Sequence, residues 1–201
     1  MDAEFSIELG RKDPVLDFPW KDPSGEFAYY DLKRHPELLA SIDEAVKFPE
    51  LGEFLEILNS PTSIVETAKC DAWLTTDLSE EESIYEASHK FASYVDAVFS
   101  DTAVRMSAIE HSLDLHERFA GALVELVRQA TEGQPMARSE ICVRRCYFGE
   151  KDGVREGCYF TLYVSGCAND GGSARRNWSK GLKVVENAIV RLSGSALSQT
   201  I

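Results

Sequence analysis

The sequence lacks the features that mark several broad classes of protein. No apolar run approaches the roughly 18 residues of a membrane-spanning helix. The first residues show no basic region followed by an apolar stretch, so we expect no signal peptide. The five cysteines are odd in number and have no CxxC spacing, which argues against a secreted disulfide framework and a zinc site. A cytoplasmic location is the natural expectation.

Basic residues are also scarce. The chain has 21 lysines and arginines against 34 aspartates and glutamates, and its formal charge is −13. Proteins that bind phosphate backbones or anionic membrane surfaces need clustered positive charge. We therefore expect no nucleic-acid partner and no membrane partner. A charge of this size favours a soluble protein and complements a basic partner.

The composition that remains is typical of one folded domain. Apolar residues make up 44% of the 201 residues, which is ordinary for a globular protein. We interpret 1–201 as a single domain with three parts. These parts are an irregular N-terminal segment (1–60), an α+β core (61–194) and a flexible tail (195–201).

Prolines concentrate in the N-terminal segment, where six of the seven lie between Pro14 and Pro61. Proline suits the first turn of a helix, where its missing N–H costs nothing. Apolar residues recur at helical spacing after Pro36 and after Pro49. We therefore predict two short helices, at 36–47 and 49–59.

Periodicity in the core predicts strands and longer helices. Residues 64–76 alternate as a strand does. Ser79 and Glu82 form a capping box, which predicts a helix continuing through Ile84, Ala87, Phe91, Val95 and Val98. Further elements are a helix at 109–132, hairpin strands at 138–149 and 156–166 joined by a charged loop, and a last helix with the apolar stripe Trp178, Leu182, Val185, Ile189 and Leu192.

This order of elements predicts a two-layer α+β fold. A small antiparallel or mixed sheet, made from strand 64–76 and hairpin 138–166, would have amphipathic helices packed on one face. If the hairpin is centred near Asp152, residues whose numbers sum to about 304 face each other. The helix-covered face would then hold Cys142, Cys146, Phe160, Leu162 and Val164. The open face would hold Val143, Arg145, Tyr147, Tyr159, Thr161 and Tyr163, joined by Lys69, Asp71 and Trp73.

An aromatic open face needs an explanation. The N-terminal segment supplies aromatic residues that would cover it, namely Phe5, Phe18, Trp20, Phe27, Tyr29 and Tyr30. We favour coverage by this segment or by a second subunit, and a site for a small molecule or a partner protein is the alternative. Stacked nucleic-acid bases are a further alternative. Arg155–Tyr163 faintly resembles the basic-glycine-aromatic strand of an RNA-recognition motif, but it lacks the alternating Gly and Phe.

Arg175 and Arg176 are the second anomaly, because positive charge in the first turn of a helix opposes its dipole. The glycine-rich loop Gly166–Gly172 precedes them, with Ser173 as the expected N-cap. A loop of this kind that enters a helix can bind an anion, although the spacing matches no phosphate-binding fingerprint. The interpretation we favour is that both arginines are solvated or pair with Asp170 and Glu186, and the anion site is the alternative.

Cysteine and histidine chemistry has weaker support. In the expected register Cys146 and Cys158 are cross-strand neighbours, and Cys142 lies two positions further along the same face of the sheet. A redox pair is conceivable, but buried unreactive thiols are the commoner case. His111 and His116 are five residues apart, so they do not share one face of a helix. No metal site and no cofactor are indicated.

Our main hypothesis is a non-catalytic protein that acts by binding another protein or a second copy of itself. An acidic inhibitor of a basic protein belongs to this class. The alternative is an anionic small-molecule binder or enzyme with a site between the open face and the Gly166–Arg176 loop. Its candidate residues are Trp73, Asp71, Arg145, Tyr147, Tyr163, Arg175 and Arg176.

Overall fold

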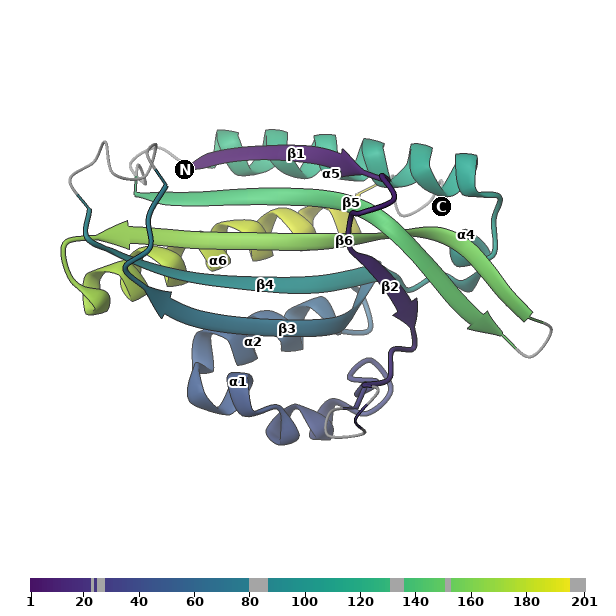
Figure 1. Cartoon of the computed structure of the whole chain (residues 1–201), viewed down its shortest axis with the longest axis horizontal. Helices are drawn as coiled ribbons and strands as arrows, with labels where there is room; N and C mark the ends of the chain where they lie inside the picture. The colour runs from purple at the N-terminus through teal and green to yellow at the C-terminus, as the bar shows by residue number, and fades with distance from the viewer. Residues whose placement is uncertain (23, 25–27, 80–86, 131–135, 151–152, 196–201) are drawn as a thin grey trace.

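The computed structural model describes residues 1–22, 24, 28–79, 87–130, 136–150 and 153–195. Within these residues the chain forms a two-layer α+β fold with one six-stranded mixed sheet (Figure 1). The strands are β1 (Asp2–Glu8), β2 (Val15–Phe18), β3 (Val65–Thr75), β4 (His89–Phe99), β5 (Ala137–Glu150) and β6 (Gly153–Ala168). The helical elements are η1 (Pro36–Ser41), α1 (Asp43–Lys47), α2 (Pro49–Leu58), α4 (Thr102–Arg105), α5 (Ile109–Gln129) and α6 (Gly171–Ser193).

The sheet runs in the order β1-β5-β6-β4-β3. Four of these strands, β5, β6, β4 and β3, pair antiparallel to their neighbours, whereas β1 and β2 pair parallel with β5. β1 and β2 follow one another along the same edge of β5, opposite residues 138–144 and 145–148.

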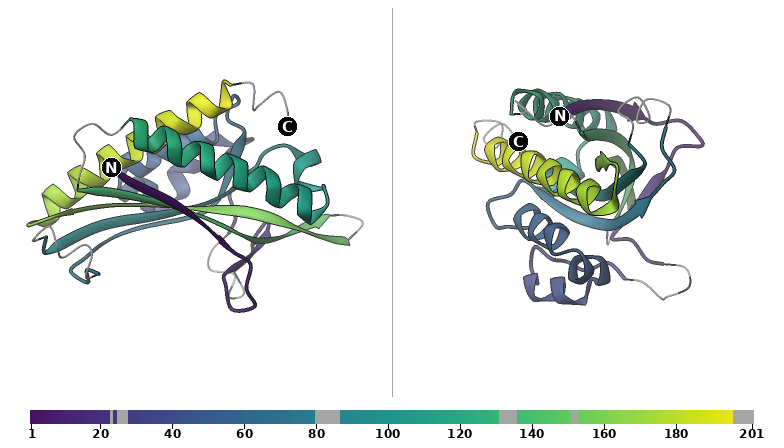
Figure 2. Two further views of the ribbon diagram at one scale, coloured as in Figure 1. Left: turned by 90° about the horizontal axis from the view of Figure 1, so that it is seen from above. Right: turned by 90° about the vertical axis from the view of Figure 1, so that its left-hand side faces the viewer.

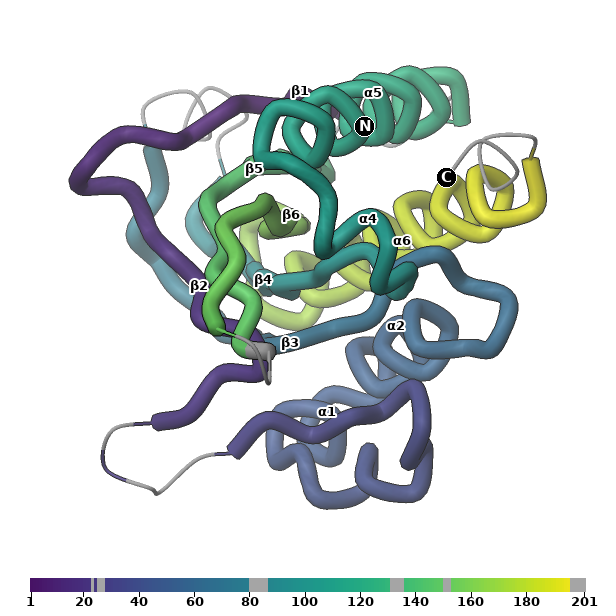
Figure 3. The backbone as a smooth tube through the Cα atoms, turned by 90° about the vertical axis from the view of Figure 1, so that its right-hand side faces the viewer, coloured from purple at the N-terminus to yellow at the C-terminus, as the bar shows by residue number. Residues whose placement is uncertain are grey.

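Helices α5 and α6 cover one face of the sheet, as the amphipathic patterns predict (Figure 2). Each has an apolar stripe of buried residues that faces the sheet. Trp178 of α6 is fully buried, and its indole N–H donates to Ser93 Oγ on β4 at 2.8 Å. Helices α1 and α2 lie beside the β3 edge (Figure 3). The predicted helix at 36–47 is divided into η1 and α1, and the one at 49–59 is α2.

The N-terminal segment contributes β1 and β2 to the sheet, whereas we expected residues 1–60 to be irregular with two short helices. In β1 the apolar residues Ala3, Phe5 and Ile7 alternate with polar ones. Residues 9–22, which follow β1, pass on the side of the sheet opposite α5 and α6 (Figure 2). The Lys33 ammonium group fixes the N-terminal segment to the core by donating to the carbonyls of Ser60, Ser63 and Val65.

The helix predicted through Ile84–Val98 is wrong over its described part, because His89–Phe99 forms β4. Phe91, Val95 and Val98 do recur at helical spacing, yet β4 is buried on both faces, and such a strand carries apolar residues at spacings that also fit a helix. Glu82 of the expected capping box and Ile84 lie outside the described residues.

The hairpin is longer than predicted, and its register differs by one residue. Pairs such as Arg145↔Cys158 and Cys146↔Gly157 sum to 303. A slip of one residue moves every side chain of a strand to the other face. Our assignment for β6 is therefore right and that for β5 is inverted: Val143 lies in the helix-covered core, whereas Cys146 packs in a separate cluster on the other face.

Two smaller predictions also change. The glycine-rich loop is short, since β6 continues through Ala168 and α6 begins at Gly171. The N-cap is Asp170, whose carboxylate accepts from the backbone N–H of Ser173 at 2.9 Å, so Ser173 lies inside the helix. The long helix predicted at 109–132 is α5, which ends at Gln129; residues 131–132 lie outside the described part of the chain.

Candidate functional site

One cross-strand row on the open face of the sheet has two aromatic rings at its centre and carboxylates at both ends. The row is Asp71 on β3, Tyr94 on β4, Tyr163 on β6, Glu140 on β5 and Glu4 on β1. Side chains in such a row are direct neighbours because opposed residues of paired strands share a face. The sheet itself therefore positions this arrangement.

Trp73 extends the aromatic part of the row. Its ring centroid is 6.4 Å from that of Tyr94, which in turn is 6.2 Å from that of Tyr163. These are ordinary separations for interacting aromatic side chains. Trp73 is 37% exposed, and both tyrosines are partly exposed. The three rings form the aromatic row, the name we use for Trp73, Tyr94 and Tyr163.

A shallow hollow of about 630 Å³ lies over one end of the aromatic row. Its lining includes Trp73, Tyr163, Lys90, Arg138 and Glu140. Arg138 forms an ion pair with Glu4, and Lys90 has an interaction partner of its own. Asp71 and Glu140, in contrast, form no ion pair with any described residue. The carboxylates of Asp71 and Glu140 are thus not neutralised by any ion pair among the described residues.

The N-terminal segment covers only the other end of the open face. Its residues Leu16, Phe18, Trp20 and Tyr29 pack over β4, β5 and β6 in a cluster that includes Tyr159. Trp20 is fixed there because its indole N–H donates to the carbonyl of Ala68 at 2.7 Å. The coverage that we expected from this segment therefore exists, but it stops short of the aromatic row. Phe5 lies on the opposite, helix-covered side, near Gly121 of α5, and Phe27 lies outside the described residues.

A buried chain of polar groups supports the row from beside it. The Arg144 guanidinium donates to Glu8 at 2.7 Å, to Thr161 Oγ1 at 2.9 Å and to the Tyr163 hydroxyl at 3.1 Å. Thr161 in turn donates to Asp96 Oδ1 at 2.7 Å. Because Arg144 holds the hydroxyl at the end of the Tyr163 side chain, the Tyr163 ring keeps a fixed position.

Burial raises the pKa of Asp96 to about 6, and the hydrogen bond from Thr161 and the nearby cations Lys69 and Arg144 only partly oppose this effect. Asp96 is 8% exposed and lies opposite Lys69 of β3. It therefore ionises close to neutral pH, although it lies beneath the surface and does not reach the hollow's lining.

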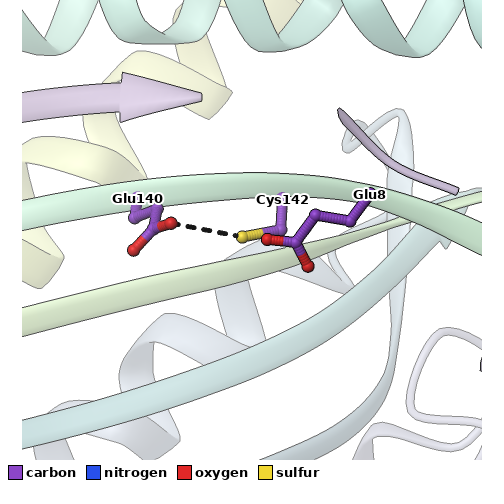
Figure 4. A group of neighbouring side chains, drawn as sticks. All are labelled: Glu8, Glu140 and Cys142. Carbon is purple, nitrogen blue, oxygen red and sulfur yellow. Dashed lines mark hydrogen bonds between the residues drawn. The ribbon is translucent and has the colours of Figure 1, made fainter. Parts of the chain in front are cut away.

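Glu8, Glu140 and Cys142 lie close enough together to suggest a cation site (Figure 4). The chemistry of the group argues against one. Arg144 already neutralises Glu8, and the Cys142 thiol donates to Glu140 at 3.7 Å. Burial raises the pKa of Cys142 to about 12, so the thiolate that a soft metal needs is disfavoured.

The expectation that Cys146 and Cys158 are cross-strand neighbours is wrong. Cys158 is paired with Arg145 and not with Cys146 in the hairpin, and none of the five cysteines, all of which lie in the described residues, forms a disulfide. Burial raises the pKa of Cys158 to about 11 and that of Cys70 to about 12, as it does for Cys142. High thiol pKa values are typical of unreactive cysteines.

The predicted site residues separate into groups. Trp73, Asp71 and Tyr163 come together on the open face. Arg145 and Tyr147 belong to the inverted strand β5 and lie away from the row, where Arg145 bonds Glu156 and the carbonyl of Leu9.

The arginines of α6 are also distant from the row. Arg175 forms a two-pronged ion pair with Glu50 of α2, with bonds of 3.1 and 2.7 Å, and lies over the Phe48 ring. Arg176 donates to Ser173 Oγ within its own helix. Glu186 pairs with Lys183 instead. Arg145 and Arg175 therefore lie apart, whereas the alternative hypothesis of an anionic-ligand site placed both in one site.

Sequence reasoning missed Tyr94, Glu140 and Glu4. Tyr94 was assigned to a helix, and Glu140 was inverted with β5. The signal for Glu4 was present in the alternation of Ala3, Phe5 and Ile7, which places the polar residues of β1 on the open face.

Comparison with protein-family models, with curated proteins and with solved structures finds no match to this chain. Among the helices of the described residues, none has the length and apolar character to cross a membrane. Functional inference therefore depends on the geometry of the open face.

Proposed function

We propose that this protein is a non-catalytic binding protein whose partner is a basic protein, and that the aromatic row on the open face is the contact surface. The observation that carries this proposal is the row Asp71–Tyr94–Tyr163–Glu140–Glu4. Tyrosine and tryptophan are the side chains most enriched where protein interfaces gain their energy, and arginine is their frequent partner. Arginine stacks on aromatic rings and pairs with carboxylates, and this row offers both.

A basic partner is favoured over a second copy by charge. Each chain carries a formal charge of −13, and the row has carboxylates at both ends. Two copies that met through this face would place like charges together, which opposes association. A basic protein would instead be attracted to it over a distance and guided to the face.

An anionic small molecule is not favoured as the ligand. The arginines proposed to bind it lie apart, on the helix layer and at the far end of the hairpin. Those of the open face, Arg138 and Arg144, are held by Glu4 and Glu8. The cytoplasmic location expected from the sequence belongs to the same proposal and is supported by five cysteines without a disulfide.

Affinity capture from the source cell at low salt tests the proposal when it is done with three forms of the protein in parallel. These are the unmodified chain, Trp73→Ala and Leu74→Ala. Leu74 is the matched control because it is the next residue of β3, is 52% exposed and points to the other face. We expect at least one basic protein to be retained by the unmodified chain and by Leu74→Ala, and to be lost with Trp73→Ala.

The captured protein is then purified and its affinity measured as salt is varied. We expect affinity to fall as salt rises, because screening weakens attraction between opposite charges. Equal retention by the Trp73 and Leu74 variants, or a partner that is acidic, would contradict the proposal.

A further inference from the structure

A second hollow, of about 510 Å³, lies beside the aromatic row, between the N-terminal segment and β3. Tyr94 lines this hollow, and its ring is next to that of Trp73 in the first one. Further lining comes from Trp20 and Tyr30 of the N-terminal segment and from residues 67–71 of β3. We call this second hollow the edge pocket.

Three aromatic side chains line the edge pocket. Trp20 cannot turn freely, because its indole N–H is bonded to the carbonyl of Ala68. The Lys69 ammonium already lies over the Trp20 ring, 4.6 Å from its centroid. Attraction of a cation to an aromatic face is strongest at tryptophan. The contact with Lys69 thus shows that the Trp20 ring already packs against one positive group.

The charge around the edge pocket is negative. Asp43, Glu44 and Asp71 line it, and Lys69 is the one cation among the described residues of the lining. None of these three carboxylates forms an ion pair with a described residue. Because Lys69 brings one positive charge against the three carboxylates, an excess of negative charge remains. A second positive group would compensate it.

We propose that the edge pocket binds the side chain of an arginine, with its guanidinium group against the rings of Trp20, Tyr30 and Tyr94 and among the three carboxylates. A guanidinium group fits because it is flat, remains charged and stacks on aromatic rings. This proposal rests on the proposed function in one respect: the protein that carries the arginine is the proposed basic partner. The pocket's preference for the side chain is a property of this chain alone.

An anion is the competing occupant, since Lys69 lines the pocket. An anion would have to lie among three carboxylates and would draw on a single cation that already contacts Trp20. A carboxylate or phosphate would meet more repulsion than attraction there. The Lys69→Met variant separates the two cases, because it removes the one cation of the described lining and keeps an apolar stem of similar length.

The indole N–H signals of the three tryptophans allow a direct test by ¹H–¹⁵N NMR of the full chain. Trp20 reports on the edge pocket, Trp73 on the aromatic row, and fully buried Trp178 on the rest of the fold. Single Trp→Phe variants assign the signals. The probe is N-acetyl-arginine methylamide, and its matched control is N-acetyl-citrulline methylamide, which has nearly the same shape and no charge.

We expect the Trp20 signal to shift on titration with the arginine probe, with a dissociation constant in the millimolar range that is usual for so small a ligand, while Trp178 stays in place. Citrulline should leave Trp20 unshifted. Lys69→Met should tighten arginine binding about fivefold, because it removes a competing cation. Asp71→Asn combined with Glu44→Gln should weaken it about tenfold.

Four results would overturn the edge-pocket proposal. These are an unmoved Trp20 signal, an equal response to citrulline, a shift of Trp73 alone, and weaker arginine binding in Lys69→Met. Failure here leaves the proposed function intact, because that proposal depends on loss of the basic partner with Trp73→Ala. Conversely, a Trp20 response to arginine stands even if capture yields no basic protein.

Discussion

Tyr94 and Tyr163 are direct cross-strand partners on β4 and β6, and their ring centroids lie 6.2 Å apart on the part of the sheet that the N-terminal segment leaves uncovered. A buried network that includes Arg144 fixes the Tyr163 ring, and Trp73 packs beside the Tyr94 ring. The fold thus preorganises the row, so that binding of the proposed partner would cost little free energy for ordering these side chains.

Two substitutions of Tyr163 should separate its roles in folding and binding. Tyr163→Phe removes only the hydroxyl that accepts from Arg144, and we expect a loss of about 1 kcal/mol in the free energy of unfolding with little change in partner affinity. Tyr163→Ala removes the ring and should weaken partner binding tenfold or more. Denaturant unfolding and a binding titration on both variants check this. Equal affinity of the two variants would contradict a role for the ring.

Asp96 should destabilise the fold at neutral pH. Its pKa is raised to about 6 in the folded state, so folding favours the protonated form. The stability gained from this form is complete at pH values below about 4 and is lost as pH rises through 6. Asp96→Asn mimics the protonated acid and can still accept from Thr161. We expect it to be more stable than the unmodified chain at pH 7.5, by roughly 2 kcal/mol, and equally stable near pH 4.

Denaturant unfolding at the two pH values measures this difference. A variant that is less stable at pH 7.5 would show that Lys69 and Arg144 favour the carboxylate more than burial opposes it.

His116 should give the opposite pH dependence. Burial lowers its pKa to about 4, and its ring packs against Phe99 and Phe160 with centroids 4.6 and 4.4 Å away. Folding therefore favours the neutral ring, and the stability it contributes is present above about 6.5 and lost as pH falls toward 4. His116→Phe keeps an aromatic ring and cannot be protonated. Thermal unfolding between pH 7 and 4 should show a smaller decline for this variant, and an unchanged decline would contradict the assignment.

Strong amphipathic periodicity made the helix layer predictable. The stripe of α6 from Trp178 to Leu192 is buried as expected, and α5 begins where the pattern indicated. These helices have one apolar face and one polar face, so a period near 3.6 is evident in the sequence. The alternation in β3 was clear for a similar reason, because β3 forms an edge of the sheet.

The central strand β4 and the register of the hairpin were not predictable in this way. β4 lies between β3 and β6 and is buried on both faces, so its pattern fits strand and helix alike. The hairpin register was misassigned by one residue, and that was enough to invert β5 and move Arg145 off the open face. The strand pairings therefore decide which site residues lie together, and no local sequence pattern specifies those pairings.

Gly166 tests the packing of α6 on the sheet. A Cβ there would lie 2.6 Å from the carbonyl oxygen of Ala174 and would also clash with the backbone nitrogen of Trp178. Gly166→Ala should therefore separate helix from strand and cost roughly 3 kcal/mol or more. Gly194→Ala is the control, because the nearest atom to its Cβ would be 3.6 Å away. Chemical denaturation compares them, and equal midpoints would contradict the close contact.

Site-specific photocrosslinking from position 73 tests the central claim most directly. Benzoylphenylalanine replaces Trp73 in one form of the full chain and Val154, which is 71% exposed at the far end of the hairpin, in another. After irradiation in the source cell, we predict a crosslink to a basic protein from position 73 and not from position 154. Crosslinks from position 73 only to a second copy of the chain, or the same products from both positions, would contradict the account.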